Sequence, residues 1–201
     1  FACISDTQGA GPTGEGIVDA FYEEIYNKIS DSPLPEDDEA YNKLKEKIKT
    51  LKILPQLGNL TSSYQQKINS KWYTLNENPM KISRMRLIFN GSEGIWEYEN
   101  ALGHHELKFG IGKKVGGPFP GKHYFGERIG TPSGKCYNCL ASAAWVEEHK
   151  LNMLVYITDY YLGTLKITFA FKGEEISIYM TKVAEWFLDE YMGFAGGILT
   201  N

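Results

Sequence analysis

Three short segments decide the fold: LNMLVYIT at residues 151–158, LKITFAFK at 165–172 and ISIYM at 176–180. In each of them apolar residues recur at every second position, which is the pattern of a β-strand with one buried face. Leu162-Gly163 and Lys172-Gly173 separate the segments. Connections this short form hairpins and exclude parallel crossovers, so the stretch predicts consecutive antiparallel strands.

The same period of two extends back along the chain as far as residue 85. It is seen in Met85–Phe89, Trp96–Tyr98, Leu107–Ile111 and Ala143–Trp145. If Lys67–Leu75 is counted as the first strand, about eight strands follow one another in up-and-down order. A meander of this length tends to close on itself, because closure removes its exposed edges. We therefore expect a mainly β, α+β fold: an antiparallel up-and-down barrel or a strongly curved sheet.

Helical spacing frames this β region. Apolar residues three and four apart predict a helix over Gly14–Ile29, after a short strand at residues 1–4. A second helix is expected from Pro35 to Leu51, because its acidic start favours a helix N-terminus. The lysine-rich side of that helix is interpreted as a solvated face. A third, short helix is expected at Val183–Gly193.

Composition excludes several classes of protein. The 201 residues are 42% hydrophobic and 13% aromatic, which is enough for a globular core and too much for a disordered chain. The net charge of −4 argues against a nucleic-acid partner. No stretch has the roughly 18–20 uncharged apolar residues that a membrane-spanning helix needs.

The interior of such a barrel is the first candidate binding site. Its aromatic residues could line a cavity for a small apolar ligand, because eight strands leave room for one such ligand or for packed side chains. The candidate ligand-binding residues are Trp72, Trp96, Trp145 and Tyr156. The high aromatic content favours an interior that side chains mostly fill.

One long segment does not fit a hairpin. Residues 110–134 contain eight glycines and three prolines, and a loop of this size in a compact domain is usually functional or mobile. We interpret it as a candidate lid. Its candidate residues are Gly116, Gly117, Phe119 and Tyr124.

Catalytic and metal-binding motifs are weak throughout the sequence. There is no Gly-x-Ser-x-Gly, no Ser-x-x-Lys and no phosphate or dinucleotide fingerprint. His104 and His105 are adjacent, so in a strand they point to opposite faces and do not easily share a metal. Glu97 and Glu99 share a face, but alternating acids are common on exposed strands. We expect no catalytic residue, no cofactor and no metal ligand.

The cysteines leave one alternative open. Cys136 and Cys139 form a Cys-x-x-Cys pair, which suits half a zinc site or a redox pair. The nearest histidines have no standard zinc spacing, and a redox pair normally opens a helix rather than a strand. Ordinary turn cysteines are the favoured interpretation, and the metal or redox protein remains a third hypothesis.

Several motifs also resemble a known family. Phe1–Thr7 with the following helix, then Lys71-Trp72-Tyr73, then Leu107–Gly112 and Ala141–Val146 resemble the C-terminal region of β-lactamase and penicillin-binding-protein-like serine hydrolases. The resemblance implies a lipocalin-like β-domain after a catalytic domain. The family's nucleophile, lysine and tyrosine belong upstream of this sequence, so none of them can be assigned to a residue here.

The resemblance implies the division of the chain and its main functional hypothesis. Residues 1–30 would be the end of an upstream catalytic domain, 31–60 a helical connector and 61–201 the barrel with its C-terminal helix. A chain that starts at Phe1 rather than Met agrees with this expectation. The chain would be a non-catalytic accessory domain, structural or substrate-gating, whose partner is that catalytic domain. Without that partner, the isolated piece would pair with itself as a homodimer. The alternative is a stand-alone lipocalin-like barrel that binds a small apolar ligand.

Overall fold

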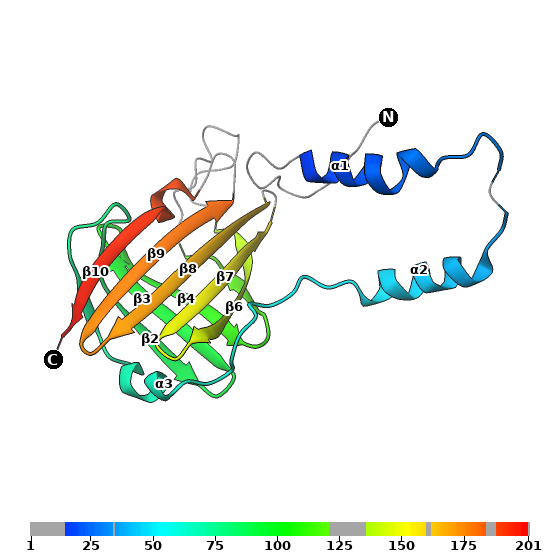
Figure 1. Ribbon diagram of the computed structural model, residues 1–201. Helices are drawn as coiled ribbons and strands as arrows, with labels where there is room; N and C mark the ends of the chain where they lie inside the picture. Colours follow the sequence, from blue (N-terminus) through cyan, green and yellow to red (C-terminus); the bar gives the residue numbers. More distant parts are fainter. Residues whose placement is uncertain (1–14, 34, 121–135, 160–161, 184–187, 201) are drawn as a thin grey trace. The chain divides into compact units, whose positions relative to one another are not determined.

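The computed structural model describes residues 15–33, 35–120, 136–159, 162–183 and 188–200 (Figure 1). The chain divides into two compact units, residues 1–54 and 55–201. The domain boundaries that the sequence predicts, at residues 30 and 60, stay predictions.

The first unit is helical, as expected. It contains α1 (Glu15–Glu24), the short 3-10 helix η2 (Tyr26–Lys28) and α2 (Asp38–Thr50). The carboxylate of Asp37 accepts a hydrogen bond from the Ala40 amide at 2.8 Å and so caps α2. The predicted strand at residues 1–4 lies outside the described residues. Among the helices that the structure describes, none is long and apolar enough to cross a membrane.

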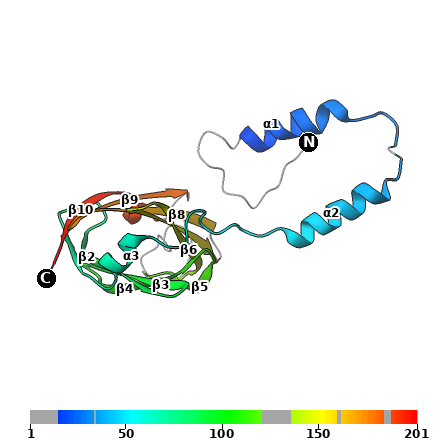
Figure 2. The same cartoon turned by 60° about the horizontal axis from the view of Figure 1, so that its bottom comes forward.

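The second unit is a closed barrel (Figures 1 and 2). Its strands are β1 (Tyr73–Leu75), β2 (Ile82–Asn90), β3 (Glu93–Asn100), β4 (Gly103–Ile111), β5 (Val115–Pro118), β6 (Asn138–Glu147), β7 (Lys150–Thr158), β8 (Leu162–Lys172), β9 (Glu175–Val183) and β10 (Gly193–Leu199). The order around the sheet is β4-β3-β2-β1-β10-β9-β8-β7-β6-β5, and a pairing of β4 with β6 closes the ring. The predicted mainly β barrel is confirmed.

The closing pair is parallel, whereas every other pair is antiparallel. Gly110 and Ile111 of β4 run alongside Ser142 and Ala143 of β6. Nine strands form the ring, and a ring with an odd number of alternating strands must contain one parallel neighbour pair. After β4 the chain reverses and β5 continues along the same edge of β6 in the antiparallel sense. The prediction of a wholly antiparallel barrel is therefore wrong at this seam.

Three local expectations need correction. The predicted first strand, Lys67–Leu75, is α3 (Ser63–Ile68) followed by the short β1, because the Ser62 hydroxyl accepts from the Tyr64 amide and starts a helix. Leu162-Gly163 is part of β8 rather than a separator. The predicted helix at Val183–Gly193 is reduced to the 3-10 helix η3 (Asp189–Tyr191), and the strand β10 that follows it was not predicted.

The barrel has two distinct ends. Helix α3 lies across one end, which we call the α3 end, and η3 lies at the opposite end, the η3 end (Figures 1 and 2). Aromatic rings pack against one another inside each half. Near the α3 end Phe89 contacts Phe109 and Trp145, with ring centroids 5.9 and 6.2 Å apart. In the middle of the barrel Trp96 contacts Tyr98, on its η3 side, and Phe169, with ring centroids 4.3 and 5.7 Å apart.

Candidate ligand-binding site at one end of the barrel

Polar side chains gather at the η3 end of an otherwise apolar core. We call the set of Trp96, Tyr98, Lys182, Asp189 and Tyr191 the η3-end cluster. Trp96 and Tyr98 lie on the inner face of β3, and both are fully buried. Tyr191 of η3 is 3% exposed. The cluster thus combines residues from β3, β9 and η3.

A chain of hydrogen bonds links two tyrosines of this cluster. The hydroxyl oxygens of Tyr98 and Tyr191 lie 2.9 Å apart, and Tyr191 donates to the Pro120 carbonyl at 3.1 Å. Since a carbonyl can only accept, Tyr98 must donate to Tyr191. Burial raises the pKa of the Tyr191 hydroxyl well above its usual range, so this hydroxyl stays protonated at neutral pH.

Trp96 differs from every other buried polar side chain that the structure describes. Its indole Nε1 has no hydrogen-bond partner within those residues. The indole of Trp145, near the α3 end, donates instead to the Gln65 side chain at 3.3 Å. Trp96 is therefore a buried donor inside the barrel that the described part of the fold does not satisfy.

Lys182 brings a charge into the same end of the barrel. In the β8–β9 register it faces Leu165, whose side chain is fully buried, so Lys182 lies at an inward-facing position. Its side chain is only 8% exposed, and its ammonium forms an ion pair with the carboxylate of Asp189. A buried charge is tolerated when it is paired, and here η3 supplies the partner.

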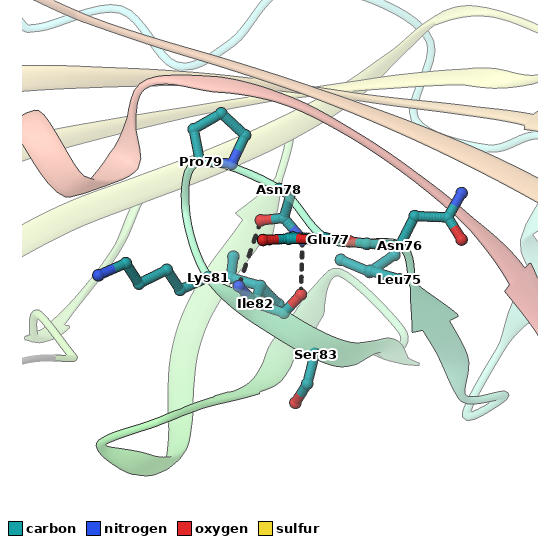
Figure 3. Close-up of a pocket in the computed structure, with 8 residues that line it drawn as sticks. All are labelled: Leu75, Asn76, Glu77, Asn78, Pro79, Lys81, Ile82 and Ser83. Atoms are coloured by element: carbon teal, nitrogen blue, oxygen red, sulfur yellow. Dashed lines mark hydrogen bonds between the residues drawn. The ribbon is translucent and has the colours of Figure 1, made fainter.

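A hollow of about 450 Å³ lies in the barrel wall beside this end (Figure 3). It is lined by the residues that connect β1 to β2: Leu75, Asn76, Glu77, Asn78, Pro79, Lys81, Ile82 and Ser83. The Asn78 side chain braces this connection, because it donates to the Ile82 carbonyl at 2.7 Å and accepts from the Ile82 amide at 3.2 Å. Because β1 ends at Leu75, the loop between β1 and β2, and not a strand, forms the barrel wall at this hollow.

The structure brings only two of the four predicted ligand-binding residues into the interior. Trp96 and Trp145 are buried there, in the two separate aromatic groups described above. Trp72 precedes β1 and lies under the guanidinium groups of Arg84 and Arg86, 4.4 and 4.7 Å from its ring centroid. Tyr156 alternates with the buried Val155 and Ile157 of β7, so it lies on the outer face.

The predicted lid residues occupy different environments. Gly116 and Gly117 belong to β5 and pair with Leu140 and Cys139 of β6. Phe119 is 1% exposed and packs edge-on against Tyr191, with centroids 5.4 Å apart. Tyr124 lies outside the described residues. The lid itself stays a prediction.

The two cysteines of the Cys-x-x-Cys pair differ in environment. Cys136 is exposed and Cys139 is buried, and neither forms a disulfide. Burial raises the pKa of the Cys139 thiol to about 12. At neutral pH this thiol is protonated, which disfavours both metal ligation and thiol exchange.

His104, Glu97 and Glu99 lie on the outer face of β3 and β4, whereas His105 faces inward. His104 and His105 point to opposite faces, as expected: His104 is exposed, whereas the His105 ring stacks on Tyr98 at 4.9 Å. Glu97 and Glu99 are each paired with an arginine. Oxygen and nitrogen atoms of Glu97, His104 and Glu106 lie within 4.8 Å of one another, but Arg86 already neutralises Glu97.

The pattern of the sequence did not identify Tyr98, Lys182 and Tyr191 as site residues. The period of two places Tyr98 in a predicted strand, and Tyr191 falls within the predicted helix Val183–Gly193. The available signal was a lysine at the inward-facing position of an otherwise regular strand, Ile176, Ile178, Met180, Lys182. A lysine is almost never fully buried unless it is paired, so a lysine at a core position indicates a specific role.

Comparisons with known proteins show a likeness at the level of solved structures alone. No family model matches the chain, and no curated protein matches it. A fatty-acid-binding protein from brain tissue of Drosophila melanogaster aligns with 66% of this chain and 99% of its own, at 10% identity and a TM-score of 0.42. A fatty-acid-binding protein of Manduca sexta covers 67% and 99%, at 10% identity and a TM-score of 0.40. Human cRBP IV covers 66% and 97%, at 11% identity and 0.39.

Proposed function

We propose that the barrel binds a small, largely apolar molecule at its η3 end. One observation carries the proposal: inward-facing polar groups of the η3-end cluster gather at a single end of a closed apolar barrel. Binding sites for small molecules combine an apolar lining with a few placed polar groups. Tyr98, Tyr191 and Lys182 supply such groups, and Phe119, which packs against Tyr191, supplies apolar surface beside them.

The proposal is tested by titrating the protein with Nile red, a neutral apolar fluorophore. We expect saturable binding with one site per chain. Tyr98→Phe, at the η3 end, should weaken binding several-fold. Tyr73→Phe is the matched control, since Tyr73 is equally buried but packs on Phe171 near the α3 end. Binding that does not saturate, or that Tyr73→Phe weakens as much as Tyr98→Phe does, would refute the proposal.

A second function is favoured by the helices of the first unit. The segment of α1 and η2, and α2 after it, carry large apolar side chains that are exposed by about half: Tyr22 46%, Ile25 54%, Tyr26 56%, Tyr41 55%, Leu44 54% and Ile48 56%. Continuous exposed apolar faces mark protein-interaction surfaces. We propose that they dock on another protein domain. The resemblance to the C-terminal region of serine hydrolases suggests a catalytic domain of that superfamily, which would make this chain a non-catalytic accessory domain.

Hydrogen exchange tests the docking function. If a serine hydrolase domain is encoded upstream in the same reading frame, amides of α1 and α2 should exchange more slowly in the parent protein than in the 201-residue chain. Ile48→Asp should abolish this protection, whereas Asn42→Asp, on the polar side of α2, should retain it. Equal exchange in the two proteins, or the absence of an upstream Ser-x-x-Lys motif, would exclude this function.

A further inference from the structure

The indole nitrogen of Trp96 is a buried hydrogen-bond donor. Among the residues that the structure describes, its Nε1 is the single buried side-chain nitrogen or oxygen without a hydrogen-bond partner. The side chain is 0% exposed, so bulk water does not satisfy it. Buried polar groups in native proteins nearly always have a partner, and a buried donor without one costs about 1–3 kcal/mol.

We propose that the missing partner is the acceptor atom of a neutral, apolar ligand, such as a ketone, ester or ether oxygen. This inference rests on the proposed binding function of the barrel and names the chemistry of its ligand. The indole N–H donates and cannot accept, so it recognises an acceptor specifically. The Tyr98 and Phe169 rings, 4.3 and 5.7 Å from the indole ring, provide the apolar surroundings for the rest of the molecule.

The charges of the cluster favour a neutral ligand over a carboxylate. The buried ammonium of Lys182 is already paired with Asp189. A carboxylate entering this end would be a buried negative charge that Lys182, already paired with the half-exposed Asp189, does not compensate, and an uncompensated buried charge is costly. The neutral indole donor requires no such compensation.

The experiment compares two probes that differ in one acceptor atom. The first is 6-propionyl-2-(dimethylamino)naphthalene, whose carbonyl can accept a hydrogen bond, and the second is its 6-propyl analogue, which lacks the carbonyl. We expect the ketone to bind about tenfold more tightly, the effect of one hydrogen bond to a buried donor. In Trp96→Phe the two affinities should become equal. Trp145→Phe, whose indole is already satisfied by Gln65, should keep the tenfold difference.

An NMR measurement keeps the test independent of how well Trp96→Phe folds. In a proton–nitrogen spectrum of the unaltered protein, the ketone should move the Trp96 indole N–H signal downfield, and the propyl analogue should not. Equal affinities for the two probes in the unaltered protein would overturn the inference and indicate that a buried water satisfies Trp96. Tighter binding of the matching 6-carboxylate would overturn it as well. If none of the probes binds, the proposed function itself fails.

Discussion

The hydroxyl oxygens of Tyr98 and Tyr191 lie 2.9 Å apart inside the barrel, although 93 positions separate the two residues in the sequence. Tyr191 donates its own hydrogen bond to the Pro120 carbonyl at 3.1 Å. Through these two bonds η3 is tied both to the inner face of β3 and to the segment that follows β5. The pair therefore holds the η3 end of the barrel together.

Tyr191→Phe tests the contribution of this pair to stability. The change leaves the Tyr98 hydroxyl and the Pro120 carbonyl without their shared partner in a buried site, so we expect a loss of about 1–3 kcal/mol in the free energy of unfolding. Urea unfolding followed by fluorescence measures it. Tyr179→Phe, at a position that is 54% exposed, should change stability by less than about 0.5 kcal/mol. Equal losses in the two variants would contradict this role.

The Lys182–Asp189 ion pair predicts an asymmetry between its two partners. Asp189→Asn removes the carboxylate from a buried ammonium, whereas Lys182→Met leaves behind an Asp189 side chain that is 55% exposed to solvent. We expect Asp189→Asn to cost about 1–3 kcal/mol and Lys182→Met to cost clearly less. Thermal unfolding of both variants at neutral pH measures the difference. The opposite order would show that the packing of the lysine stem, rather than its charge, matters at this position.

Gly94 on β3 is predicted to tolerate no side chain. A Cβ atom there would lie 2.4 Å from Phe109 Cζ and 2.7 Å from the Ile88 carbonyl oxygen. Gly94→Ala should therefore cost about 1–3 kcal/mol through overpacking. Gly117→Ala is the matched control, because a Cβ atom at Gly117 on β5 would meet nothing within 4 Å. A folded Gly94→Ala protein as stable as the control would show that Phe109 can move aside.

Ion pairs on the outer surface predict the response to acid. Hydrogen bonds from Lys113, Arg84 and Lys150 lower the pKa of Glu93, Glu99 and Glu147, respectively. A carboxyl whose pKa is lower in the folded state stabilises the protein above its unfolded pKa, and this contribution is lost as the pH falls through the folded pKa. Stability should therefore fall below about pH 4.5.

Urea unfolding at several pH values checks this sign. Glu99→Gln should reduce the dependence of stability on pH below pH ~4.5, since one of the linked protons is removed. Arg84→Gln, which removes the hydrogen-bond donor that lowers the Glu99 pKa, should reduce the dependence as well. A steeper dependence in Glu99→Gln would contradict the assignment.

The local patterns of the sequence determined most of the barrel. The alternation in β7, β8 and β9 and the turns at Gly91 and Gly173 set strand direction and the buried face, because both depend only on neighbouring residues. The capped helix α2 was likewise predictable from its acidic start. Inward positions such as Trp96 and Trp145 followed from the same period of two.

Only the tertiary structure decided how the ring closes and where its polar groups meet. The parallel pairing of β4 with β6 and the addition of β10 depend on contacts between distant segments, which no local pattern records. The same is true of the η3-end cluster, since Tyr98, Lys182 and Tyr191 come from three separate elements. Whether Trp96 Nε1 finds a partner is also a property of the packed interior, and that is the feature on which the proposed ligand chemistry depends.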